Sequence, residues 1–183
     1  MLHRRTALVS AAALLLGAGL FGVSALPASG EPTAAGLAAS WNKIRVNTVA
    51  AAERRMDAEV GEDGETLVFF AVLTDEADVD LPPTGESPGD FFLFEEQLYT
   101  DRALTQPAGS DSVRGELSLT TITFEATFKL SGGKIRIAGS LFGPLDITFP
   151  ITGGTGEYRD AGGVFIPFGL PNGDTLLLFR VIR

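Results

Sequence analysis

The chain has 183 residues and a formal net charge of −9, with 14 Lys and Arg against 23 Asp and Glu. It has no cysteine, and its one histidine is His3, which excludes a Ser-His-Asp triad, a cysteine nucleophile, a disulfide and a zinc site of the usual nitrogen and sulfur type from the rest of the sequence. The acidic balance also argues against binding to nucleic acid or to anionic lipid, because both would repel it.

The first 30 residues (1–30) have the features of a secretory signal peptide. Arg4 and Arg5 precede an apolar segment at 7–23, and Ala28-Ser29-Gly30 offers small residues for cleavage. The alternative is a transmembrane anchor, for which an apolar segment interrupted by glycines is marginal. The two arginines suit either general or twin-arginine export. Cleavage would leave a secreted protein with 12 Lys and Arg against 23 Asp and Glu and no stable membrane insertion.

Residues 31–60 are expected to form an N-terminal tether with either a short helix or an early strand. The stretch 31–42 has no clear strand period. Residues 49–56 have a helix-forming composition, whereas residues 43–47 alternate like a strand. The sequence leaves these alternatives open, and the folded domain is expected over 61–183.

The folded domain shows the pattern of an all-β protein. Apolar or alternating segments are separated by loops at 75–89 and 101–110 and by short turns in the second half. The expected strands are 66–74, 90–99, 112–120, 122–130, 134–141, 145–151, 164–170 and 175–182. Eight strands at roughly ten-residue spacing predict an eight-stranded antiparallel closed β-barrel. A barrel of that size either fills with side chains or holds one small ligand.

The last expected strand, 175–182, is apolar on both faces. Arg180 is the one polar residue in its interior. Such a strand needs a cover on its outer side. Either the segment 43–60 supplies that cover, or a second copy of the chain does so in a homo-oligomer.

A glycine-rich run follows the sixth expected strand. Five glycines fall between Gly153 and Gly163, a density that predicts a tight chain reversal. Tyr158 and Arg159 lie inside this run and either brace the reversal or contact a ligand. The motif residues are Gly153, Gly154, Gly156, Tyr158 and Arg159.

Three segments together resemble the allene oxide cyclase-like and dirigent-like barrel family, in a bacterial, secreted form. They are DFFLFEEQLY at 90–99, FEATF at 124–128 and ITGGTGEYRDAGG at 151–163, and the likeness extends over 66–183. The resemblance implies the eight-stranded barrel and oligomers whose barrels pack side by side. It also implies a small hydrophobic ligand and, if the protein is an enzyme, a cyclisation, isomerisation or stereo-directed coupling without a cofactor.

The family's known site residues are only partly present here. Ala71 stands near the position of the cyclase glutamate, and Glu96 stands at the position of the cyclase asparagine. Asp75 matches the dirigent aspartate, but Ala161-Gly162-Gly163 lacks the dirigent arginine. The resemblance therefore does not imply the plant cyclase reaction itself.

The candidate catalytic residues are Glu96, Tyr99 and Asp75. Glu95 and Glu96 point to opposite faces, so one of them faces the interior unless both lie beyond the buried part of the strand. A buried carboxyl has a raised pKa and can act as a general acid. Tyr99 is either a hydrogen-bond donor or an amphipathic rim residue, and Asp75 is either a pocket acid or a loop cap. The expected pocket walls are Phe92, Phe94, Phe124, Phe128 and Phe149.

Three functional hypotheses follow, and no cofactor or metal is expected. The acidic residues of 75–90 could bind calcium, but they lack the spacing of a calcium loop and are expected to be solvated. The leading hypothesis is an exported barrel that binds a small hydrophobic molecule and acts as a cyclase, isomerase or stereo-directing protein. The others are a non-catalytic, lipocalin-like binding module and a structural oligomer with a filled barrel. A cavity with carboxyls favours catalysis, an apolar cavity favours carriage, and a lumen packed by phenylalanines favours the structural role.

Overall fold

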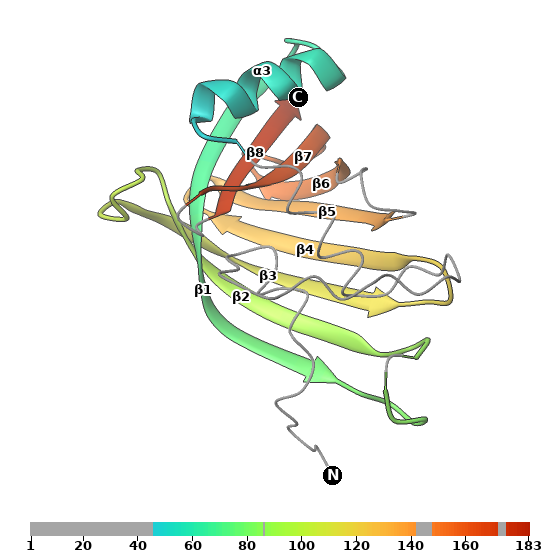
Figure 1. Ribbon diagram of the computed structural model, residues 1–183. Coiled ribbons are helices and arrows are strands. Elements are labelled where there is room, and N and C mark those ends of the chain that lie inside the picture. The colour runs from blue at the N-terminus through green and yellow to red at the C-terminus, as the bar shows by residue number, and fades with distance from the viewer. Residues whose placement is uncertain (1–45, 86, 142–147, 172–174) are drawn as a thin grey trace.

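A computed structural model describes residues 46–85, 87–141, 148–171 and 175–183, so the expected signal peptide lies outside the described residues. Eight antiparallel strands follow one another in chain order, and the first pairs with the last to close a barrel (Figure 1). This confirms the predicted fold class. The strands are β1 (Glu65–Val79), β2 (Phe91–Tyr99), β3 (Pro107–Leu117), β4 (Ile122–Leu130), β5 (Gly133–Leu141), β6 (Phe149–Gly156), β7 (Gly162–Gly169) and β8 (Thr175–Ile182).

The segment before the barrel contains a helix, which decides between the two alternatives left open for it. The helix α3 (Val49–Val60) begins where the Thr48 side chain accepts a hydrogen bond from the Ala51 N–H, and it ends at Gly61. Its buried residues are Ala52 and Met56. Among the described residues, no helix is long and apolar enough to cross a membrane.

Helix α3 covers the outer side of β8 and lies beside it in Figure 1. Residues 175–181 are all buried, although their side chains alternate between two faces. Leu177 and Phe179 face the barrel interior, and Leu178 and Arg180 face outward, where α3 covers them. Arg180 donates hydrogen bonds to the Asp57 carboxylate and to the Glu62 carbonyl oxygen. The first explanation for the apolar outer face is therefore correct, and a homo-oligomer stays a prediction.

The expected bounds of β1, β3 and β6 were wrong, and two of these errors, at the end of β1 and at the start of β3, have the same cause. Strand β1 continues through Asp75 to Val79 after a bulge between Leu73 and Asp75, so the acidic loop begins five residues later than expected. Strand β3 begins at Pro107 instead of 112 and ends at Leu117. Both errors arose because acidic residues, proline and glycine are typical of loops, although an exposed strand end accommodates them as well.

The glycine-rich run is part strand and part turn, which corrects its interpretation as a chain reversal alone. Strand β6 includes Gly153, Gly154 and Gly156 and pairs with β5. A side chain at Gly154 would meet the Lys134 carbonyl oxygen at 2.1 Å, so this position requires glycine. The reversal itself follows at 157–161. Part of the strand expected at 145–151 lies outside the described residues.

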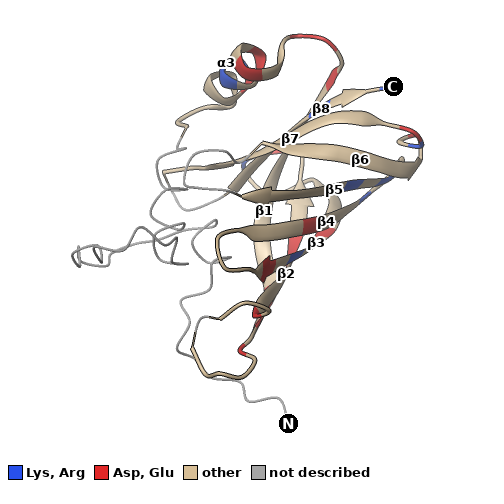
Figure 2. Cartoon of the chain, turned by 90° about the vertical axis from the view of Figure 1, so that its right-hand side faces the viewer, with Lys and Arg blue, Asp and Glu red and all other residues tan. Residues whose placement is uncertain are grey.

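The outer surface carries the charged side chains that alternate with the core. Glu125 on β4 and Lys134 and Arg136 on β5 are exposed, and the two strands carry red and blue bands in Figure 2. Their neighbours in sequence, such as Phe124 and Ile135, are buried. The period of two thus places one face of each strand in the barrel interior.

Phenylalanines fill one half of the interior. The Phe179 ring centroid lies 4.8 Å from that of Phe128, 4.8 Å from that of Phe165 and 6.0 Å from that of Phe69. Phe179 is fully buried. We call these four rings the aromatic plug. Thr175 and Leu177, nearer the start of β8, lie outside the aromatic plug.

Candidate functional site

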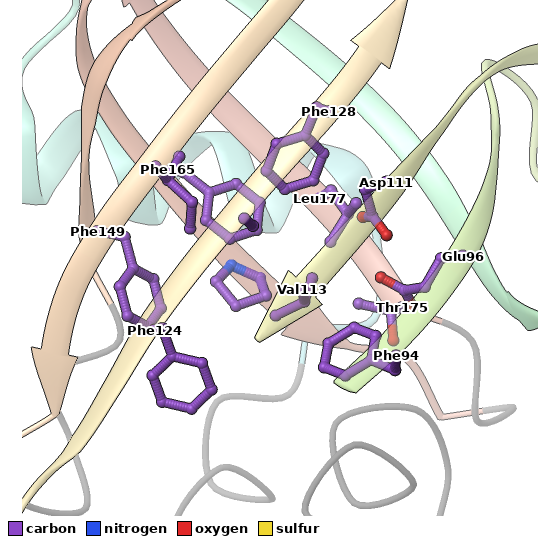
Figure 3. Close-up of a pocket in the computed structure, with 13 residues that line it drawn as sticks. Phe94, Glu96, Asp111, Val113, Phe124, Phe128, Phe149, Phe165, Thr175 and Leu177 are labelled. Carbon is purple, nitrogen blue, oxygen red and sulfur yellow. The ribbon is translucent and has the colours of Figure 1, made fainter. Parts of the chain in front are cut away.

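A pocket lies in the half of the barrel that the aromatic plug leaves open (Figure 3). The space between its walls, including the part that is open to solvent, has a volume of about 520 Å³. The part that the centres of water molecules can reach is about 40 Å³. One water needs roughly 10–15 Å³ of such volume, so the pocket admits a small group. The lining residues are Phe94, Glu96, Asp111, Val113, Phe124, Ala126, Phe128, Ile137, Phe149, Phe165, Pro167, Thr175 and Leu177.

Two carboxyl groups face each other within these apolar walls. Glu96 lies on β2 directly opposite Asp111 on β3, and in Figure 3 their side chains point toward one another. Glu96 is 4% exposed and Asp111 is 3% exposed, whereas the neighbouring Glu95 is exposed. The alternation prediction that one of the two glutamates faces the interior is therefore confirmed. We call Glu96 and Asp111 the carboxyl pair.

Burial makes the charged form of each carboxyl unfavourable. Burial is the largest cause that raises the pKa of Asp111, to about 7, and the charge of Glu95 adds to the effect. Burial also raises the pKa of Glu96 well above its ordinary value, and the charge of Asp111 and a hydrogen bond to it raise that pKa further. The pair as a whole therefore binds protons more readily than two exposed carboxyls do.

A proton shared within the pair also satisfies its hydrogen bonding. With both groups ionised, Oε1 of Glu96 would be buried without a donor from any described residue, and the Asp111 carboxylate would be left with the backbone N–H of Glu96. A protonated Glu96 instead donates to the Asp111 carboxylate. Two carboxylates this close in an apolar site do not both ionise near neutral pH. At neutral pH the pair therefore keeps at least one proton.

An acid and a base side by side can move a proton on a bound molecule. The acid can protonate an oxygen or an unsaturated carbon, and the carboxylate can remove a proton from another atom. The two groups can then exchange a proton directly, which restores the starting state without another reactant. The apolar phenylalanine walls lower the local polarity, which strengthens the electrostatic effect of both groups.

The structure brings most of the expected wall residues together. Phe94, Phe124, Phe128 and Phe149 line the pocket. Phe92 is buried against Phe94, with parallel rings and centroids 6.3 Å apart, but it does not line the pocket. Phe92 thus packs against two of the wall residues, Phe94 and Phe124.

Two of the three proposed catalytic residues lie outside the pocket. Tyr99 is half-buried at the end of β2, on the face opposite Glu96. Asp75 is exposed on β1, where it pairs in register with the exposed Glu95. Neither side chain lines the pocket, and Glu96 is the proposed catalytic residue that the structure places there.

The motif residues of the glycine-rich run also lie away from the pocket. Tyr158 is buried in the reversal between β6 and β7, and Arg159 is exposed there. This reversal is at the barrel end opposite Thr175, because Gly162 pairs with Ile182 while Gly169 pairs with Thr175. Their position fits the bracing role that the sequence allowed.

The sequence analysis missed Asp111 and Thr175. Asp111 fell between the loop expected at 101–110, which contains Pro107 and Gly109, and the strand expected from residue 112. The signal that could have found it is the alternation of Asp111, Val113 and Gly115 with exposed residues, which extends the buried face of β3 back to Asp111. Thr175 was included in the last strand without a role, and in Figure 3 it lies beside Glu96.

The described residues contain no group of three or more His, Cys, Asp or Glu side chains that could hold a metal ion. The carboxyl pair is a group of two, and its walls supply no further charged side chain. The acidic residues at the end of β1 and in the following loop are used in local contacts instead. The Asp90 carboxylate, for example, accepts hydrogen bonds from the N–H groups of Leu81 and Ser87.

Comparisons with protein-family models and with curated protein sequences each give no match. Several solved structures are similar in fold. A pyocyanin demethylase shares 23% identity with a TM-score of 0.56, over 64% of this chain and 100% of that protein. The Diels-Alderase AbmU from Streptomyces koyangensis shares 18% identity with a TM-score of 0.52, over 87% of this chain and 83% of AbmU. AbnU, an exo-specific intermolecular Diels-Alderase, shares 14% identity with a TM-score of 0.51, over 64% of this chain and 96% of AbnU. At these identities the likeness shows the barrel fold alone.

Proposed function

We propose that the protein binds a small hydrophobic molecule in the barrel and isomerises or cyclises it by proton transfer from the carboxyl pair. The observation that carries this proposal is the pair itself, two buried carboxyls opposite each other in an otherwise apolar pocket. Buried acids with raised pKa values are typical of general acid and base catalysts. The Diels-Alderase names of two similar barrels agree with cyclisation on this scaffold.

The proposed reaction balances without a redox partner. Glu96 donates its proton to an oxygen or an unsaturated carbon of the substrate, which leaves positive charge on the substrate. The substrate rearranges or closes a ring, and the Asp111 carboxylate removes a proton from a neighbouring carbon. The proton then passes from Asp111 to Glu96, which restores the pair. No atom or electron is left over, so the reaction is an isomerisation.

We further propose that the protein is an exported, signal-bearing member of the allene oxide cyclase-like and dirigent-like barrels. The sequence features of residues 1–30 and the three resembling segments support this assignment. The side-by-side oligomers of that family are part of the proposal. Edman sequencing of the secreted protein would test export, and an N-terminus other than one near Glu31 would count against the assigned cleavage site.

A direct test combines capture with turnover. The purified protein is incubated with lipid and polyketide extracts, and retained molecules are identified by native mass spectrometry and then incubated in D₂O. We expect a product of unchanged elemental composition that carries deuterium from the solvent. Glu96→Gln should lower the rate by about 10²–10⁴-fold, whereas Glu125→Gln, which removes an exposed carboxyl on β4, should leave it unchanged. Retention without any turnover would favour the lipocalin-like alternative.

A further inference from the structure

The pocket carries negative charge and no positive partner for it. None of its lining side chains is a lysine, an arginine or a histidine. When Asp111 loses its proton, the carboxyl pair has one net negative charge within walls of phenylalanine, valine, isoleucine and leucine. A buried charge without a counter-charge is costly. When both groups are ionised, Oε1 of Glu96 also lacks a donor among the described residues, and the Asp111 carboxylate is left with the backbone N–H of Glu96.

The aromatic walls add a second feature that favours a cation. Their ring centroids form a continuous series, with Phe124 5.4 Å from Phe149, Phe149 6.1 Å from Phe165, and Phe165 5.2 Å from Phe128. These rings meet at angles of 34° to 66°, so faces as well as edges border the space between them. The face of an aromatic ring attracts positive charge, and more strongly when water is excluded.

We propose that the pocket binds a positively charged group, and that its ligand is a small, flat, unsaturated molecule with a protonated or quaternary nitrogen. The nitrogen would lie between the carboxyl pair and the phenylalanine rings. This inference rests on the proposed function, since it names the substrate class of the same pocket. A substrate that is already cationic, or becomes so when Glu96 protonates it, meets the counter-charge that the empty pocket lacks.

The experiment compares two probes of nearly equal shape. Phenyltrimethylammonium has a permanent positive charge, and tert-butylbenzene is its neutral counterpart. Binding of each to the purified protein is measured by ligand-observed NMR and calorimetry at pH 8 and at pH 5.5. We expect phenyltrimethylammonium to bind at least tenfold more tightly at pH 8 and to lose at least tenfold in affinity at pH 5.5.

The pH effect follows from the groups that face Asp111. These are Glu96 on β2 and the uncharged Phe128 directly opposite on β4, while the exposed Glu95 acts on Asp111 through its charge alone. Acid protonates Asp111 and makes the pair neutral, while the charge of the probe does not change. Tert-butylbenzene should therefore bind equally at both pH values. Asp111→Asn should abolish the preference for the cation and retain tert-butylbenzene, and Glu125→Gln should alter neither.

The possible outcomes separate the two proposals. Binding of tert-butylbenzene alone, or of both probes equally, overturns the cation inference and leaves the hydrophobic pocket in place. A cation preference that persists in Asp111→Asn and in Glu96→Gln also overturns it. If neither probe binds, both the inference and the proposed ligand pocket fail. The wild-type comparison needs no substitution, so a variant that does not fold leaves the test intact.

Discussion

Phenylalanine has different roles in the two halves of the barrel interior. In the aromatic plug, Phe179 is fully buried against three other rings, two of which, Phe128 and Phe165, also border the pocket. In the pocket half, Phe94, Phe124 and Phe149 surround empty space and two carboxyl groups. Burial of the rings stabilises the plug, whereas burial of the carboxyls costs stability and changes their chemistry. The comparison indicates that burial of the plug rings offsets the free energy that the fold loses by burying the two carboxyls.

The largest expected effect is in the plug. Phe179→Ala removes a fully buried ring and should lower the free energy of unfolding by about 3–5 kcal/mol, measured by urea denaturation. Phe94→Ala is the matched variant in the pocket half. It should cost clearly less, because one side of the Phe94 ring already borders empty space and loses fewer contacts. Equal losses would mean that the two halves do not differ in packing.

Removing the carboxyl pair should raise the free energy of unfolding, whereas removing a ring of the aromatic plug lowers it. The folded-state pKa values of both groups are raised, so the folded protein binds more protons than the unfolded chain, and its stability falls as the pH rises from about 4 through about 7. The double variant Glu96→Gln/Asp111→Asn should remove this slope. At pH 8 it should be more stable than the wild type by up to about 4 kcal/mol, since each pKa unit corresponds to about 1.4 kcal/mol.

The control for this effect is Asp75→Asn, which neutralises an exposed carboxyl on β1. Its unfolding free energy should follow the wild type at every pH. The account of the pair would be contradicted if the double variant lost stability at pH 8, because that would mean that the two carboxyls stabilise the fold.

A smaller effect is expected where helix α3 joins the barrel. Asp57→Ala leaves the buried Arg180 guanidinium without its carboxylate and should cost about 2 kcal/mol of unfolding free energy. Adding Arg180→Met should recover most of that loss. The comparison variant is Glu65→Ala, because its ion pair with Arg183 is exposed and is expected to contribute less than about 1 kcal/mol. Similar losses at both sites would contradict the difference in burial.

The smallest effect lies outside both halves, on the surface. Lys129 on β4 and Lys134 on β5 are exposed and directly opposite each other. Like charges in this position repel, so Lys134→Glu should raise the unfolding free energy by about 0.5 kcal/mol at low salt. The gain should shrink as salt is added. A gain that does not depend on salt would show another cause.

Sequence patterns predicted what depends on periodicity. The bounds of β4 and β8 were correct, because alternation and the surrounding turns define them. Alternation also placed one carboxyl of Glu95 and Glu96 inside. Asp111 was missed since a buried acid interrupts the apolar face that marks a strand, and its partner lies 15 positions earlier in the sequence. The register that joins them results from strand pairing and is not a local property.

The central claim is that the carboxyl pair holds a proton at neutral pH. The most direct measurement is a titration of the side-chain carboxyl carbons of Glu96 and Asp111 by ¹³C NMR, with Glu96→Gln and Asp111→Asn for assignment. The account predicts that both apparent pKa values are raised, one of them to about 7, and that both belong to the pair. Two ordinary titrations near pH 4 would contradict the claim, and with it the proposed proton transfer.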